Sequence, residues 1–333
     1  MGDRHILIIG SGSVGKRHAR NFSALGCRIS CVDPRAERRD ELAQETAIVG
    51  SFADEKEALA AARYDGVVIG SPPHVHVDQT IAALDAGAAV LLEKPVCPDL
   101  ASGERLAQAA ARASVPVLMG YTWRWWPPLI DVRRQLADGS IGTVRHVQFH
   151  MSAHLADWHP WERYQDFFMA RRELGGGALL DESHWIDLML WLFGMPKTVT
   201  GSIDKISELE IDVDDNVDLL FTYESGPRVT MHLDLFGRPH EKFIRFIGSE
   251  GTLLWSADPN QIAISRTANH DWKTQTYNCE RNDMFVGVAK EFLDVIGGAA
   301  VTTCKIADGV NVLKVIEAAR KASADGRSMA IAA

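Results

Sequence analysis

The first 120 residues of the chain alternate short apolar runs with segments of helical periodicity. The apolar runs have no polar alternation, as expected of strands buried on both faces, and comprise residues 5–10, 28–33, 65–70, 88–93 and 115–120. Helical patterns separate them, at residues 13–26, 36–46, 54–63, 74–87 and 99–113. Strands that alternate with helices predict βαβ units, and therefore an α/β domain with a parallel, doubly wound sheet.

The pattern changes in residues 142–260, where apolar and polar positions partly alternate. Residues 143–153, 217–225 and 228–236 show this period-two alternation with many β-branched and aromatic side chains, which predicts strands. Residues 241–255, EKFIRFIGSEGTLLW, predict a hairpin. In such a sheet one face is buried, and the other is left for water or a partner subunit.

Composition narrows the class of protein. The 333 residues favour two domains, and 46% hydrophobic with 24% charged residues is typical of a globular enzyme or binding protein. A net charge of −9 without a dense basic run argues against nucleic acid or an anionic membrane as partner. Five cysteines without a CxxC pair argue against a disulfide framework or a zinc site, and neither a signal peptide nor a membrane-spanning run is evident, so we predict a cytoplasmic location.

A glycine-rich turn, GSGSVG, follows the first predicted strand and opens a helix. This is the context that a dinucleotide needs: Gly10 permits the tight turn, Gly12 lets the backbone approach a pyrophosphate, and Gly15 lets helix and strand pack closely. The phosphates would meet backbone N–H groups at the positive end of the helix dipole. We therefore predict cofactor contacts from the whole turn, including Ser13 and Val14.

The second predicted strand ends at Asp33, 18 residues after Gly15. A carboxylate there can accept hydrogen bonds from the ribose hydroxyls and repels a 2′-phosphate, which favours NAD over NADP. Arg35, Arg38 and Arg39 follow directly, and they would suit a 2′-phosphate if Asp33 turned away. NAD is therefore the preferred cofactor, and NADP stays open.

Two further strand ends carry polar groups, at the sheet edge where ligands bind in open α/β folds. The segment GSPPHVH supplies Ser71, Pro72 and His76 as candidate cofactor contacts, although His76 fits a helix start equally well. The segment EKP supplies Glu93 and Lys94, and the proline that follows keeps Lys94 out of helical geometry.

These motifs, in this order, resemble the glucose–fructose oxidoreductase, inositol dehydrogenase and MocA (Gfo/Idh/MocA) family. The resemblance continues through GYTWRWWPP (120–128), GSIGTVR (139–145), GGGALLDESHWIDLMLWLFG (175–194), GSEGTL (248–253) and residues 291–327. It implies a Rossmann domain over residues 1–122 and an α+β domain over residues 123–333, with a large, mostly antiparallel sheet that commonly mediates oligomer formation. A homodimer or homotetramer is therefore expected, with the last helix free to pack back on the first domain.

The resemblance also implies a catalytic set. Relatives use the EKP lysine to hydrogen-bond the reacting oxygen and an Asp–His pair on a helix for acid–base chemistry, which correspond here to Lys94, Asp181 and His184. The spacing departs from the common Asp-x-Gly-x-His-x-x-Asp form, because DESHWID has one residue fewer between Asp181 and His184. On a continuous helix this change turns Asp181 by about 100°. His184 keeps its register with Asp187, so either aspartate is a candidate partner for His184.

The substrate pocket is less sharply indicated. Six of nine tryptophans lie between positions 123 and 185, where core packing competes with contacts to the faces of sugar rings. A polar and aromatic segment before the glycines offers Trp161, Arg163, Tyr164 and Arg172, and the Arg124 and Asp187 positions complete the candidate set. No HExxH or similar spacing predicts a metal.

Together these features predict an NAD(P)-dependent oxidoreductase that acts on a secondary alcohol or ketone of a sugar, cyclitol or sugar derivative. Two alternatives remain: a dinucleotide-binding regulator without turnover, and a sugar–sugar oxidoreductase with tightly bound cofactor. The presence of both Lys94 and His184 favours an enzyme.

Overall fold

The computed structural model describes residues 4–158, 160, 162–269 and 271–332. It divides into two compact units, Met1–Thr122 with Arg281–Val310, and Trp123–Glu280 with Asn311–Ala333. The second unit is therefore not the continuous stretch 123–333 that we predicted, because Arg281–Val310 joins the first unit. None of the helices in the described part of the chain is both long enough and apolar enough to cross a bilayer.

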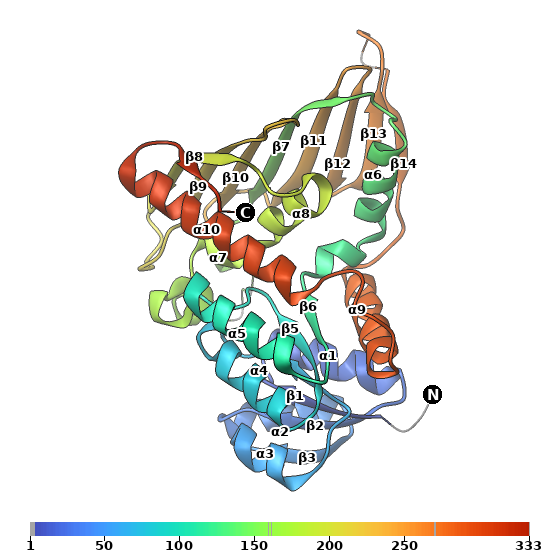
Figure 1. Ribbon diagram of the computed structural model, residues 1–333, viewed down its shortest axis with the longest axis vertical. Helices are drawn as coiled ribbons and strands as arrows, with labels where there is room; N and C mark the ends of the chain where they lie inside the picture. Colours follow the sequence, from blue (N-terminus) through green and yellow to red (C-terminus); the bar gives the residue numbers. More distant parts are fainter. Residues whose placement is uncertain (1–3, 159, 161, 270, 333) are drawn as a thin grey trace. The chain divides into compact units, whose positions relative to one another are not determined.

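The first unit, which includes α1–α5 (Figure 1), is built on a parallel six-stranded sheet. The strand order is β3-β2-β1-β4-β5-β6. Its strands are β1 (His5–Ile9), β2 (Arg28–Val32), β3 (Ile48–Phe52), β4 (Gly66–Ile69), β5 (Ala89–Glu93) and β6 (Val117–Gly120). Its helices are α1 (Ser13–Ala24), α2 (Ala36–Glu45), α3 (Glu55–Ala61), α4 (His76–Asp85), α5 (Leu100–Arg112) and α9 (Arg281–Ile296). The predicted parallel α/β fold is confirmed, and β1, β4 and β5 are completely buried.

Helix α9 belongs to this unit because of its apolar face. The Phe292 ring lies 5.9 Å from the Phe22 ring of α1, and the Phe285 ring lies 5.6 Å from the His18 ring. At Gly66 a Cβ atom would come within 2.7 Å of Phe292, so β4 and α9 are in direct contact. The two phenylalanines are buried here, and this burial holds a segment distant in sequence on the first sheet.

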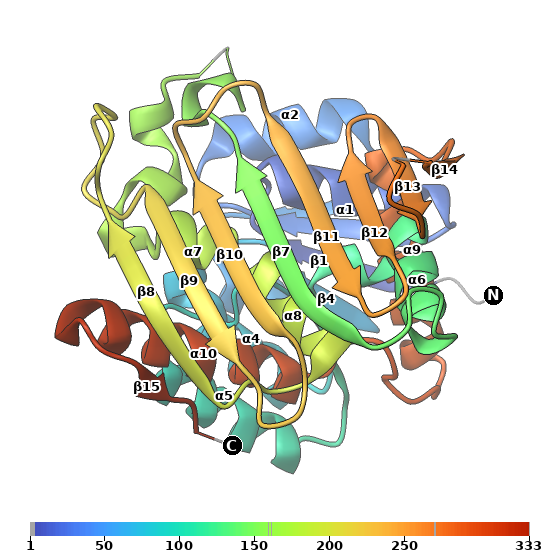
Figure 2. The ribbon, with the colours of Figure 1, turned by 90° about the horizontal axis from the view of Figure 1, so that it is seen from above.

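The second unit is built on a nine-stranded sheet with the order β14-β13-β12-β11-β7-β10-β9-β8-β15 (Figure 2). Its strands are β7 (Val144–Ser152), β8 (Thr198–Asp204), β9 (Asn216–Thr222), β10 (Arg228–Asp234), β11 (Glu241–Gly248), β12 (Thr252–Ala257), β13 (Asn260–Ser265), β14 (Lys273–Thr276) and β15 (Met329–Ala330). Strands β7 and β10 pair in parallel, and the other pairs are antiparallel. The predicted large, mostly antiparallel sheet is confirmed, and β11 with β12 forms the predicted hairpin.

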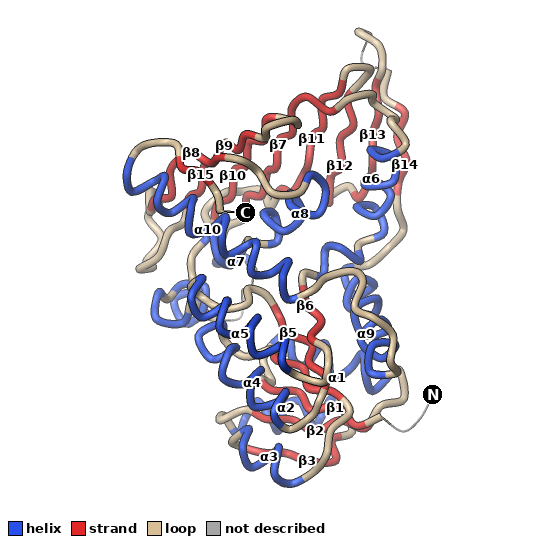
Figure 3. The backbone as a smooth tube through the Cα atoms, viewed as in Figure 1, coloured by secondary structure: helices blue, strands red, loops and turns tan. Residues whose placement is uncertain are grey.

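The two faces of this sheet differ, as the period-two pattern predicts. One face carries Phe149 and Trp255, which lie 6.2 and 6.3 Å from the ring of Trp185 on helix α8 (His184–Phe193). Helix α6 (Pro127–Ala137) also packs beside β12 and β13, so helices and strands form two layers (Figure 3). The opposite face is partly polar, with His150 and His232 stacked at 5.3 Å. Helix α10 (Ile306–Asp325) passes from the first unit into the second.

Candidate functional site

The glycine-rich turn lies between β1 and α1, where the dinucleotide motif requires it. Gly10 has a φ of +93°, and Gly12 is the N-cap of α1 without a side-chain hydrogen bond to the helix. A Cβ atom on Gly15 would lie 1.8 Å from the carbonyl oxygen of Gly10. The turn therefore closes only with glycine at its first and last positions, which leaves Ser13 and Val14 in the first turn of α1.

We expect Gly15→Ala to destabilise the first unit and to abolish dinucleotide binding, because its methyl group overlaps backbone. Gly12→Ala is the matched control for stability, since its Cβ would lie 3.2 Å from the flexible end of Arg38. Thermal unfolding of both variants measures stability, and NAD titration of Gly15→Ala measures the loss of binding against the wild type. A Gly15→Ala protein as stable as Gly12→Ala would contradict the prediction.

Asp33 lies at the end of β2, beside this turn. Its carboxylate accepts hydrogen bonds from the Ser11 N–H at 2.9 Å and from the Arg35 N–H at 3.0 Å, and the residue is only 4% exposed. The Arg35 guanidinium is half exposed, with Nε 3.8 Å from Oδ1 of Asp33. Asp33 thus stays turned toward the glycine turn, the orientation that suits a ribose diol.

His76 bridges two loops: the SPP loop, residues 71–73, and the EKP loop, residues 93–95. Its Nε2 lies 2.8 Å from the Ser71 carbonyl oxygen, and its Nδ1 lies 2.9 Å from the Pro95 carbonyl oxygen. Burial lowers the pKa of His76, which is 0% exposed. A buried ring with both nitrogens against backbone carbonyls favours a structural role over the cofactor contact that we predicted. Ser71 and Pro72 are half-buried on the same loop.

The EKP loop is also held through Glu93. The Oε1 atom of Glu93 lies 2.7 Å from Nε2 of His18, and the two side chains are 7% and 0% exposed. Lys94, the next residue, is half-buried. The sequence did not indicate His18 as a partner of Glu93; its only signal was a histidine three residues after the last glycine of the motif.

The segment around His184 is not one continuous helix. Helix α7 spans Ala178–Asp181, and α8 begins at His184. The break is a two-residue turn at Glu182 and Ser183, where backbone hydrogen bonds span three residues: the Ser183 N–H donates to the Leu180 carbonyl oxygen at 3.3 Å, and the Trp185 N–H to the Glu182 carbonyl oxygen at 3.0 Å. The Glu182 carboxylate also accepts a hydrogen bond from Nε1 of Trp185 at 3.0 Å. Asp181 and His184 therefore belong to different helices, and a rotation counted along one helix does not apply to them.

The start of α7 is fixed by Asp214 from the loop before β9. Its Oδ2 accepts a hydrogen bond from the Leu179 N–H at 2.8 Å, and a Cβ atom on Gly177 would lie 2.4 Å from its Oδ1. Burial raises the pKa of the Asp214 carboxyl. The glycines before α7 thus allow close approach to Asp214. Asp181 is 4% exposed, and His184 is half-buried.

Asp187 forms a buried ion pair with Arg124. The guanidinium donates from Nε to Oδ2 at 2.9 Å and from NH2 to Oδ1 at 2.7 Å, and the side chains are 4% and 1% exposed. This bidentate contact joins the 3₁₀ turn Thr122–Trp125 to α8. It favours a structural role for both residues over the substrate contacts that we predicted.

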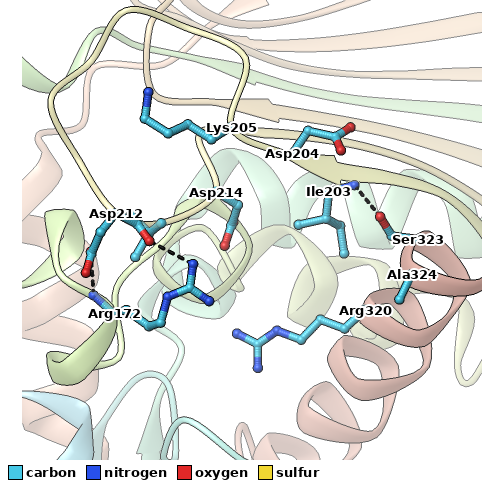
Figure 4. Close-up of a pocket in the computed structure, with 10 residues that line it drawn as sticks. Arg172, Ile203, Asp204, Lys205, Asp212, Asp214, Arg320, Ser323 and Ala324 are labelled. Carbon is cyan, nitrogen blue, oxygen red and sulfur yellow. Dashed lines mark hydrogen bonds between the residues drawn. The ribbon is translucent and has the colours of Figure 1, made fainter.

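The remaining substrate candidates are dispersed. Arg163 is exposed, and the Tyr164 hydroxyl accepts a hydrogen bond from the Glu210 N–H at 3.2 Å. Arg172 lines a pocket of about 440 Å³ with Lys205, Asp212, Asp214 and Arg320 (Figure 4), and its guanidinium donates to the Asp212 carbonyl oxygen at 2.8 Å. Trp161 lies outside the described residues. In the described part of the chain, no cluster of His, Cys, Asp or Glu is arranged to hold a metal ion.

The fold and the glycine turn define a dinucleotide-binding protein, and comparison with known proteins identifies its family. Residues 4–121 match the model of the oxidoreductase family with an NAD-binding Rossmann fold, and residues 129–254 match the model of the Gfo/Idh/MocA C-terminal domain. The chain belongs to the Gfo/Idh/MocA family of oxidoreductases.

Two curated relatives show the range of this similarity. The scyllo-inositol 2-dehydrogenase (NADP(+)) IolW of Bacillus subtilis (strain 168) is 26% identical over 294 residues, which cover 79% of this chain and 78% of the relative. The D-apiose dehydrogenase of Paraburkholderia graminis is 26% identical over 260 residues, which cover 75% of this chain and 67% of the relative.

Solved structures share the fold over the whole chain. Levoglucosan dehydrogenase in complex with NADH superposes with a TM-score of 0.88 at 17% identity, covering 99% of this chain and 100% of that chain. The WlbA dehydrogenase from Bordetella pertussis, in complex with NADH and UDP-GlcNAcA, gives a TM-score of 0.83 at 19% identity and covers both chains completely.

Proposed function

We propose that this oxidoreductase transfers a hydride between a nicotinamide dinucleotide and a secondary alcohol or ketone of a sugar or cyclitol. The observation that carries the proposal is the joint geometry of the glycine turn and Asp33. The steric fit of Gly15 against Gly10 and the orientation of the Asp33 carboxylate match the needs of a pyrophosphate and a ribose. The sugar and cyclitol dehydrogenases among the relatives support the substrate class.

The residues at the carboxyl edge of the first sheet fit the dinucleotide. The N–H groups of Gly12, Ser13 and Val14, at the start of α1, would hold the pyrophosphate, and Asp33 would accept from the adenosine ribose. When bound, the nicotinamide supplies the site that accepts or donates the hydride. Ser71, Pro72 and Glu93 belong to the loops at the same edge.

We assign the proton chemistry to side chains of this chain. The Lys94 ammonium donates a hydrogen bond to the reacting oxygen, which polarises the C–O bond. The His184 imidazole takes the hydroxyl proton during oxidation and returns it during reduction. Asp181, at the end of α7, stabilises the protonated imidazole.

A panel of sugars, sugar acids and cyclitols tests the proposal, with NAD and NADP each followed by nicotinamide absorbance. Scyllo-inositol, D-apiose and levoglucosan belong in the panel because relatives act on them according to their names. Release of nucleotide on denaturation of the purified protein would instead favour the sugar–sugar oxidoreductase with tightly held cofactor. Dinucleotide binding without turnover of any panel member would support the regulator.

We expect NAD to be preferred, since Asp33 repels a 2′-phosphate. Asp33→Asn keeps one oxygen to accept from backbone but removes the charge, so the NADP-to-NAD ratio of kcat/KM should rise about tenfold or more. Arg35→Gln is the control with the opposite expected effect, because it removes a positive charge and should lower the NADP-to-NAD ratio of kcat/KM. An unchanged ratio in Asp33→Asn would contradict this assignment.

We further propose that the polar face of the second sheet joins two or four copies in the cytoplasm. Leu220 and Ile247 on this face are 38% and 39% exposed, among polar neighbours such as Gln148 and Thr230. Such a mixed surface is common at subunit interfaces. Light scattering of the purified protein measures the number of copies.

A further inference from the structure

Two buried histidines contact the EKP loop on the two sides of Lys94. His18 reaches Glu93, the residue before Lys94, through Nε2 and Oε1 at 2.7 Å. His76 reaches Pro95, the residue after Lys94, through Nδ1 and the carbonyl oxygen at 2.9 Å. Both histidines are 0% exposed, and both belong to the first unit.

The contact from His18 is costly to break. Glu93 is buried, and loss of His18 would remove the 2.7 Å contact at Oε1 and leave the weaker 3.4 Å hydrogen bond from the Lys94 N–H to Oε2, which is unfavourable for a buried carboxylate. The ring of His18 is itself held between aromatic side chains, with Phe22 at 6.3 Å and Phe285 at 5.6 Å. His18 therefore has little freedom to move away, and it fixes the Glu93 side of the loop from helix α1.

The contact from His76 fixes the other side. Its second nitrogen lies 2.8 Å from the Ser71 carbonyl oxygen, so the ring bridges the SPP loop and the EKP loop. A neutral imidazole has one N–H and donates to one of these carbonyl groups at a time, whereas an imidazolium donates to both. In either form the ring occupies the space between the two loops.

We infer that His18 and His76 are positioning residues, which hold the Glu93–Pro95 turn on both sides and thereby set the direction of the Lys94 amine. The inference rests on the catalytic role proposed for Lys94. Neither histidine needs to contact cofactor or substrate. A displacement of a reacting group by about 1 Å can lower the rate about 100-fold, so loss of either histidine contact should lower kcat.

Matched amide variants separate the individual contacts. Asparagine places its amide near the Nδ1 position of an imidazole, and glutamine reaches the Nε2 position. His76→Asn therefore retains a donor toward Pro95, and His76→Gln retains one toward Ser71 only. His18→Gln retains a donor toward Glu93, and His18→Asn does not reach it.

The test measures the acetylation rate of individual lysines in the full chain by peptide mass spectrometry, without cofactor. His18→Asn and His76→Gln should change the labelling of Lys94 about threefold or more, and the retaining variants His18→Gln and His76→Asn should change it less. Lys56, exposed on α3, is the internal control and should label equally in all proteins. Wild-type labelling of Lys94 in His18→Asn and His76→Gln would overturn the inference. Parallel changes at Lys94 and Lys56 would also overturn it, since they indicate general loosening.

The kcat for the best panel substrate separates the positioning role of the histidines from the catalytic role proposed for Lys94. His76→Gln should lower kcat about tenfold relative to His76→Asn, with little change in KM for the dinucleotide. In a Lys94→Ala background His76→Gln should cause no further loss, because the histidine acts through the lysine. A further multiplicative loss would overturn the inference and leave the role of Lys94 intact. Normal turnover by Lys94→Ala alone would defeat the catalytic role proposed for Lys94, and the labelling of Lys94 would still show whether the two histidines position the turn.

Discussion

Replacement of Lys94 by alanine is expected to lower kcat about 100-fold or more, while the affinity for NAD stays within about threefold of the wild type. The physical reason is that the amine stabilises charge on the reacting oxygen, whereas the glycine turn and Asp33 hold the dinucleotide. Steady-state kinetics on the best panel substrate and NAD titration by fluorescence measure the two effects separately. His184→Ala should likewise lower kcat and leave the affinity for NAD nearly unchanged.

Lys56→Ala is the control for this prediction, because Lys56 is an exposed lysine of the same unit. Its kinetics should match those of the wild type. Near-normal turnover in both Lys94→Ala and His184→Ala would defeat the catalytic assignment. Equal losses of turnover and NAD affinity in Lys94→Ala would instead mean that the lysine serves cofactor binding.

The largest effect on stability is expected at the Arg124–Asp187 pair. Asp187→Asn or Arg124→Ala should lower the free energy of unfolding by about 3–5 kcal/mol, because each leaves a buried charge without its bidentate partner. Urea unfolding followed by tryptophan fluorescence measures the loss. Arg134→Ala is the matched control, since Arg134 forms exposed pairs with Asp131 and Asp138 and should leave the unfolding midpoint near that of the wild type.

The double variant Arg124→Leu/Asp187→Leu sharpens this test. Two apolar side chains remove both charges of the pair, so the double variant should be more stable than either single variant. Single variants with wild-type stability would show that the pair contributes nothing. A double variant less stable than both would show that packing around α8, rather than the ion pair, dominates.

Most of the fold could be predicted from the apolar pattern alone. Runs such as residues 5–10 and 88–93 are continuous because their strands are buried on both faces, and each forms a parallel strand. Strand β3 was not predicted, because Ile48–Phe52 includes Gly50 and Ser51 and lies at a half-exposed sheet edge. Edge strands lack the long apolar signal that marks central ones.

The sequence predicted which residues belong to the candidate site, but not which of them contact one another. Its hydrogen-bond partners come from distant parts of the chain: 75 residues separate His18 from Glu93, and 63 separate Arg124 from Asp187. Periodicity and short motifs carry no information on such pairs. The break between α7 and α8 was not predicted either, because no glycine or proline marks the turn at Glu182 and Ser183.

The assignment of α9 to the first unit has a consequence for biosynthesis. All six strands of that unit have been made when the ribosome reaches Gly120, but the helix that covers Phe22 and Gly66 arrives only with Arg281–Ile296. A nascent chain must therefore carry this apolar surface through the synthesis of every strand from β7 to β14. The N-terminal unit begins first, yet it cannot be completed before most of the second unit has been translated. Chaperone contact during this interval is expected to concentrate on the surface that α9 later covers.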